Sequence, residues 1–175
     1  MVCYLDLVYM AVDVPELDQP GSHGLLRTRW FPLAMTEPAT FMVIMLIAVS
    51  HYATVHGTED MKLKLLHLRY EALQAINKKL SLGPEAIDDA LIGSVSKIAS
   101  YEAMFGSLDN FKLHMQGLIQ MIHLRGGLSS LGLGGLLRRI VIWVDHNSAF
   151  LYGLSPYFPF ENFNPGEVSS HPNPG

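Results

Sequence analysis

Two consecutive glycines, Gly126 and Gly127, lie between two long apolar segments and constrain this chain more than any other feature. The segment before them, 111–122, and the segment after them, 135–145, both repeat apolar residues at the three- and four-residue spacing of an amphipathic helix. Glycine reaches positive φ without a Cβ clash and commonly ends helices. The glycine pair therefore predicts that one helix ends there and that a turn through 131–135 leads into a second, antiparallel helix.

The composition fits one domain whose surface carries few charges. The chain has 175 residues, enough for a single domain with a substantial core, and 49% of them are hydrophobic. Only 16% are charged, against about 25% in an average domain, so we expect a partner to cover part of the surface. The net charge is −4 and the basic residues are scattered, which argues against direct nucleic-acid binding by this chain.

Cysteine content and hydropathy exclude further classes. Cys3 is the only cysteine, so disulfide frameworks and thiolate zinc sites within one chain are excluded, and no metal or other cofactor is expected. No basic segment precedes an apolar one at the N-terminus, which argues against a secretory signal. The longest apolar run, 41–49, falls short of the ~20 residues that a membrane span needs, and we interpret it as part of a buried helix. These features fit an intracellular soluble protein without membrane association.

Proline, glycine and capping residues delimit five expected helices. The first is expected to start at Pro38 and to run to about residue 55, apolar on nearly every side and therefore central in the core. Thr58 is a candidate cap for the second helix and Asp109 for the fourth. Apolar residues recur at roughly heptad spacing along the second helix, at Leu63, Leu66, Tyr70, Leu73 and Leu80.

The same kinds of residue set the expected ends of the other helices. The third helix is expected to restart after Gly83-Pro84 and to end near residue 105, and the fifth to cover about 135–151. No segment shows the alternation of a strand, so the fold class is an all-α antiparallel bundle, or array of helical pairs, of about five helices. We divide the chain into an irregular N-terminal segment at 1–29, a helical domain at 30–154 and a flexible, disordered tail rich in Pro, Asn and Gly at 155–175.

Four stretches, taken in order, resemble the fungal-specific transcription factor domain, the helical regulatory region that follows the binuclear zinc cluster of fungal activators. The first runs from Trp30-Phe31 through Glu37-Pro38 to Phe41, and the second is Tyr101-Glu102-Ala-Met-Phe-Gly106. The others run from Phe111 through His114-Met115-Gln-Gly117 to Leu128, and from Leu131-Gly-Leu through Arg138 to Trp143-Val-Asp145.

This resemblance implies an all-α regulatory domain, a nuclear location and a role in transcription. The implied partners are proteins of the transcription machinery or a DNA-binding module outside this chain, together with a small-molecule effector. The family's zinc cluster needs six cysteines and this chain has one, so the cluster is absent from it. The chain therefore resembles a truncated member of the family.

Three polar residues stand beside apolar stripes of the expected hairpin: Glu102, His114 and Arg125. Buried charges need partners, so we expect an internal polar network that joins the third helix, the fourth helix and the glycine turn. The less favoured interpretation is an effector pocket, whose candidate residues are Glu102, His114, Arg125, Gly126, Gly127, Trp143 and Asp145.

Patterns that suggest other chemistry have simpler interpretations. Asp-His-Asn-Ser at 145–148 contains hydrolase residue types, but consecutive helical side chains diverge by about 100° and do not converge on a substrate. His67 and Glu71 share a helix face without an obvious third metal ligand, which favours an exposed ion pair. Glycines at 132, 134 and 135 could hold an anion, but they follow a helix and not a strand, which favours a turn between helices.

The leading hypothesis is a transcription-regulator domain that acts through protein contacts or effector sensing. A helical scaffold or interaction protein unrelated to transcription is the alternative from another class. An enzyme is the least favoured interpretation, because no residues with matched catalytic roles are recognisable.

Overall fold

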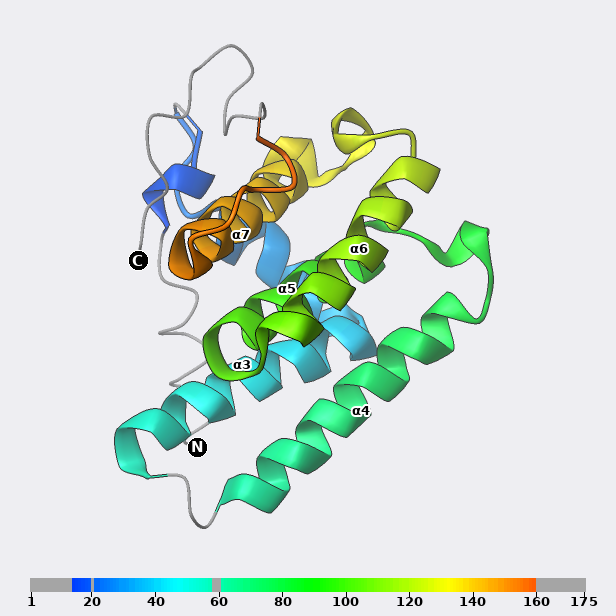
Figure 1. The fold of residues 1–175 in the computed structure, drawn as a ribbon. Coiled ribbons are helices and arrows are strands. Elements are labelled where there is room, and N and C mark those ends of the chain that lie inside the picture. The colour runs from blue at the N-terminus through cyan, green and yellow to red at the C-terminus, as the bar shows by residue number, and fades with distance from the viewer. Residues whose placement is uncertain (1–13, 20, 58–60, 160–175) are drawn as a thin grey trace.

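The computed structural model describes residues 14–19, 21–57 and 61–159, which form a bundle of six α-helices (Figure 1). Within these ranges there is no strand, and the only β-type pairing is an isolated bridge between Gln19 and Ser22. The all-α prediction is therefore confirmed, with one helix more than expected. The helices are α2 (Phe31–Thr36), α3 (Pro38–His56), α4 (Lys62–Leu80), α5 (Asp89–Phe105), α6 (Leu108–Leu124) and α7 (Leu136–Tyr152).

Local chemistry explains where the helices start. Glu37 is extended, with φ −110° and ψ 116°, and Pro38 opens α3 as predicted. Asp88 caps α5 by accepting a hydrogen bond from the Leu91 N–H at 2.8 Å.

One predicted cap is not where the sequence placed it. Ser107, not Asp109, caps α6 by accepting from the Asn110 N–H at 3.3 Å. Only Ser107 has the extended backbone of a cap, whereas Asp109 already lies in the first helical turn. Thr58 lies outside the described residues, and α4 begins at Lys62.

The described residues before Trp30, 14–19 and 21–29, are more ordered than their loop-like sequence predicts. They contain a 3-10 turn at Pro15–Leu17 and a π-helical turn at Leu26–Trp30 that continues directly into α2. Leu17, Leu25 and Leu26 are buried in the core. The core of the protein therefore extends N-terminal to the predicted boundary at residue 30.

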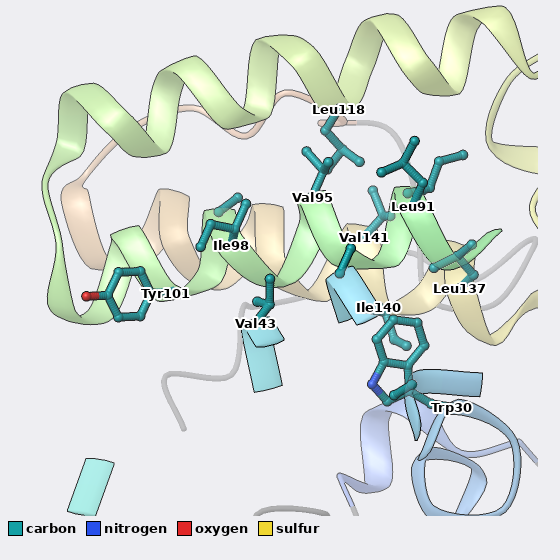
Figure 2. Close-up of a cluster of buried hydrophobic side chains, with 14 of the residues drawn as sticks. Trp30, Val43, Leu91, Val95, Ile98, Tyr101, Leu118, Leu137, Ile140 and Val141 are labelled. Atoms are coloured by element: carbon teal, nitrogen blue, oxygen red, sulfur yellow. The ribbon is translucent and has the colours of Figure 1, made fainter. Parts of the chain in front are cut away.

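The central helix is α5, not α3 as predicted. It packs against α3, α4, α6 and α7, and nearly all of its residues are buried. Its small residues let neighbouring helices approach from several sides, whereas the C-terminal turn of α3 is largely exposed. Figure 2 shows the resulting cluster, in which α5 side chains meet those of α3, α6 and α7 and the indole of Trp30: Val43, Leu91, Val95, Ile98, Leu118, Leu137, Ile140 and Val141.

By length and composition alone, α3 is apolar enough to cross a membrane. Core helices of globular domains meet the same criterion. In this fold α3 packs against α4 and α5, and its Val43 and Leu46 side chains are fully buried. Those contacts are what a helix of the protein core makes.

The glycine pair closes α6, as the sequence predicts. The Gly126 N–H donates to the His123 carbonyl at 3.0 Å, and the Gly127 N–H donates to the Ile122 carbonyl at 2.9 Å. This is the Schellman arrangement, which satisfies the last carbonyls of a helix. Gly126 has φ 94°, and Gly127 has φ 98° with ψ 177°, a region that only glycine occupies readily.

Alanine substitutions should separate the helical glycine from the turn glycines. Gly117 lies inside α6 with open space at its Cβ position, so Gly117→Ala should raise the free energy of unfolding by up to ~1 kcal/mol. Gly126→Ala and Gly127→Ala should lower it by about 1–2 kcal/mol each, because of their positive φ values. Urea unfolding of the three variants measures these changes. Turn variants as stable as the parent would show that the glycine pair does not require left-handed geometry.

Candidate functional site

A buried carboxylate at the C-terminal end of α5 organises the first polar cluster. Glu102 is fully buried, and its Oε1 accepts from Arg69 Nε at 2.8 Å and Nη2 at 2.6 Å. Its Oε2 accepts from the Ser107 N–H at 3.3 Å and from Asn110 Nδ2 at 3.4 Å. These partners satisfy a charge that would otherwise be costly to bury. We call Glu102, Arg69, Ser107 and Asn110 the Glu102 cluster.

His114 lies within electrostatic reach of the Glu102 cluster, as the predicted network requires. Burial lowers the pKa of His114; the Glu102 carboxylate opposes this shift and the Arg69 guanidinium reinforces it. Burial therefore favours the neutral form of the imidazole. The structure thus places His114 close enough to feel the charges of the cluster, whose main cation is Arg69 of α4, a residue that the sequence does not single out.

Arg125 does not join this network. Its Nη1 donates to the Ile87 carbonyl at 3.0 Å and its Nη2 pairs with Asp89 Oδ1 at 3.0 Å. Because α5 and α6 are antiparallel, the end of α6 meets the start of α5, a helix length away from Glu102 (Figure 1). The single predicted network is thus two separate clusters at opposite ends of α5.

The glycine turn borders an open pocket of about 700 Å³. Gly127 lines it, whereas Gly126 does not, and Ile122, His123, Leu128, Arg138 and Phe158 lie around it. Gly134 and Gly135 are at positive φ, and Gln19 and Arg29 donate to the Gly134 and Leu133 carbonyls. These two carbonyl groups face hydrogen-bond donors, as in a turn between helices. The sequence also favours such a turn over an anion site.

Asp145 binds the backbone at the beginning of the predicted tail. It is fully buried, and its two carboxylate oxygens accept from the Tyr157 and Phe158 N–H groups at 3.0 and 2.8 Å. Burial raises the pKa of Asp145, although the two N–H donors favour its charged form. His146 Nε2 lies 3.1 Å from the Phe158 carbonyl. These residues therefore hold 157–158 on α7 and form no hydrolytic arrangement.

Trp143 borders a second, smaller pocket of about 210 Å³ between α5 and α7. Trp143 Nε1 and Asn147 Oδ1 are buried there without a hydrogen-bond partner among the described residues. The rest of the lining is mostly apolar and includes Ser100, Ala103, Met104 and Leu151. The seven candidate residues of the predicted effector pocket are thus spread over several places and do not form one cavity.

The sequence pattern does not single out Lys97, which the structure shows to be unusual. It lies among buried residues in the middle of α5, and desolvation lowers its pKa to about 8. The one available sequence signal is its place between Val95 and Ile98 within an apolar pattern.

Titration of the Lys97 amine should make stability depend on pH. Its pKa is lower when folded than the 10.5 of the unfolded chain, so the cost of the buried charge is full below pH 8 and disappears as the pH rises toward 10.5. Lys97→Met should therefore stabilise the fold at pH 7 by up to about 2 kcal/mol, and by little at pH 10.5. Urea unfolding of both proteins across this range measures the difference. A gain that is the same at every pH would reflect packing and not titration.

An exposed apolar feature runs along α4. Residues at alternating spacings of three and four follow one side of this helix, and we call them the α4 stripe: Leu63, Leu66, Tyr70, Leu73, Asn77 and Leu80. Leu63, Leu66 and Tyr70 are 82%, 62% and 60% exposed. The residues of α4 buried in the core are instead Ala72 and Ile76, on another side. Figure 1 shows α4 at the outer edge of the bundle.

The remaining sequence pattern concerns metal binding at His67 and Glu71. His67 Nε2 and Glu71 Oε1 form an exposed i,i+4 pair at 3.2 Å, as predicted. No group of three His, Cys, Asp or Glu side chains in the described part of the chain could hold a metal ion.

Comparison with known proteins gives one result. Residues 20–173 match the family described as "Fungal specific transcription factor domain". No curated protein and no solved structure matches the chain. The match covers most of the sequence, including all six α-helices.

Proposed function

Because the chain belongs to the fungal specific transcription factor domain family, we propose that it regulates transcription in the nucleus by binding another protein at the α4 stripe. It acts without direct contact to DNA and without catalysis. The observation that carries this proposal is the exposure of Leu63, Leu66 and Tyr70 on one side of a single helix. Contiguous apolar patches of this kind mark interaction sites in soluble domains.

The charge of the chain also supports binding to a protein rather than to DNA. Its net charge is −4, and affinity for duplex DNA depends on lysine and arginine residues that displace counterions from phosphates. The purified chain should therefore form no salt-sensitive, submicromolar complex with duplex DNA.

A tethering assay tests the proposal. The full chain is fused to a heterologous DNA-binding module, and transcription from a reporter carrying that module's site is measured. Leu66→Ser should change reporter output toward that of the module alone. Leu113→Ser is the matched control, because Leu113 on α6 is also 62% exposed but lies away from the stripe. Equal output from the parent, both variants and the module alone would refute the proposal.

Effector sensing is the second candidate, and the pocket bordered by Trp143 and Asn147 favours it. The pocket's mostly apolar lining suits a small aromatic ligand, and Asn147 adds an amide side chain to that lining. Benzyl alcohol is a suitable probe: it should raise the melting temperature of the parent but not of Asn147→Leu. An unchanged melting temperature of the parent would count against an effector site here.

A further inference from the structure

Two arginine side chains meet the glycine turn at the N-terminal end of α7. Gly134 and Gly135 precede this helix with φ values of 63° and 81°, and neither has a Cβ to cover its backbone. A Cβ at Gly134 would collide with Arg29 Nη1, and one at Gly135 would lie 3.5 Å from Arg139 Nη1. The turn that the sequence favours here is therefore also the meeting point of two guanidinium groups, which sequence spacing does not show.

Arg139 is the unusual member of this pair. It is 3% exposed, and its Nε donates to the Leu17 carbonyl at 2.9 Å. Its Nη2 is buried without a hydrogen-bond partner, and no carboxylate among the residues that the structure describes forms an ion pair with it. A buried cation normally has a charged partner, so the unsatisfied nitrogen points to an anionic ligand.

The surrounding charges do not satisfy Arg139. Burial lowers the pKa of Arg139, the Arg138 and Arg29 cations lower it further, and the Asp18 carboxylate opposes them. Asp18 instead accepts from two backbone N–H groups of the following loop, at 3.1 Å each. Asp89 lies against the same turn but is already held in an ion pair at the end of α6. Arg29 and Arg139 thus share the positive end of the α7 dipole without a carboxylate of their own.

We propose that the N-terminal end of α7 binds a phosphate group between Arg29 and Arg139. The ligand is inorganic phosphate or the phosphate monoester of a small molecule. Guanidinium groups bind phosphate oxygens in pairs, and the first N–H groups of a helix, which have no intrahelical partner, favour the same ligand. The site shares no residue with the α4 stripe or with the pocket lined by Trp143 and Asn147, so it goes beyond the proposed function.

Calorimetric titration of the full chain with inorganic phosphate tests the proposal. Sodium chloride keeps the ionic strength constant, so that general charge screening does not change during the titration. The parent should bind one phosphate per chain, and phosphate should raise its melting temperature. Arg29→Gln should weaken binding by about tenfold, because it removes one charged donor from an exposed position. Arg139→Met should abolish binding, but it also alters the core, so Arg29→Gln is the decisive variant.

A neighbouring arginine and a second ligand provide the controls. Arg27 is exposed on the same π-helical turn as Arg29 but does not lie against the glycines, so Arg27→Gln should bind phosphate like the parent. Glycerol 3-phosphate that binds at least as tightly as inorganic phosphate would assign the site to monoesters, and binding of inorganic phosphate alone would assign it to the free ion. No saturable binding of either ligand by the parent, or equal affinities of the parent and Arg29→Gln, overturns the proposal.

Discussion

Gly93→Ala should lower the free energy of unfolding by about 3 kcal/mol, at the upper end of the cost of overpacking a core. Gly93 lies in the middle of α5, and the six-membered ring of Trp30 covers its backbone. A Cβ at this position would meet Trp30 Cη2 and Cζ3 at 2.1 and 2.3 Å. Trp30 is 4% exposed and is held between the π-helical turn and the core, so the rigid indole cannot simply move away (Figure 2).

Trp30→Leu provides the partner substitution for this measurement. A shorter side chain leaves room for the Cβ, and alanine is the better helix former, so Gly93→Ala should be nearly neutral in the Trp30→Leu background. Urea unfolding of the parent, both single variants and the double variant gives the coupling energy. Gly117→Ala serves as the control, because that helical glycine has open space around it. An equal loss with and without the indole would mean that contact with Trp30 is not the reason for the glycine.

Arg69→Met should lower the free energy of unfolding by about 3 kcal/mol, because it leaves the buried Glu102 carboxylate without its cation. We choose the lower end of the range for a broken buried pair, since the Arg69 side chain is 29% exposed whereas that of Glu102 is 0% exposed. Ser107 and Asn110 would remain as the carboxylate's donors.

Thermal and urea unfolding measure this loss, and a surface pair on the same helix is its control. Glu71→Gln breaks the exposed pair with His67 and should change the free energy of unfolding by less than about 0.5 kcal/mol. Arg69→Lys should fall between the two, because an ammonium group cannot reproduce the two-nitrogen contact with Oε1. Arg69→Met as stable as Glu71→Gln would contradict a structural role for the Glu102 cluster.

The sequence predicted the local features of this fold. Pro38 marks the start of α3, the glycine pair marks the end of α6, and apolar spacing marks the extent of the helices. These predictions succeed because a proline, a glycine or a capping side chain acts on backbone atoms within a few residues of itself. The caps of α5 and α6 show the limit: several Asp and Ser residues were eligible at each helix start, and only backbone geometry selects Asp88 and Ser107.

The sequence also predicted that Glu102 needs a partner, but tertiary structure alone decided which one. Burial of a carboxylate requires compensation whatever its source. Arg69 is 33 positions away, on a helix that the sequence does not orient relative to α5. Arg125 was the nearer choice in the predicted hairpin, yet the antiparallel arrangement of α5 and α6 carries it to Asp89 at the opposite end.

The side of α4 that meets the core was likewise decided only by tertiary structure. The heptad pattern from Leu63 to Leu80 marks an apolar side, but Ala72 and Ile76 offer a second one. Periodicity reports that a side of a helix is apolar and does not report what covers it. The packing of α3 and α5 buries Ala72 and Ile76, because small and compact side chains allow helices to approach closely. Leu63, Leu66 and Tyr70 are thereby left on the outside of the bundle, where a partner can reach them.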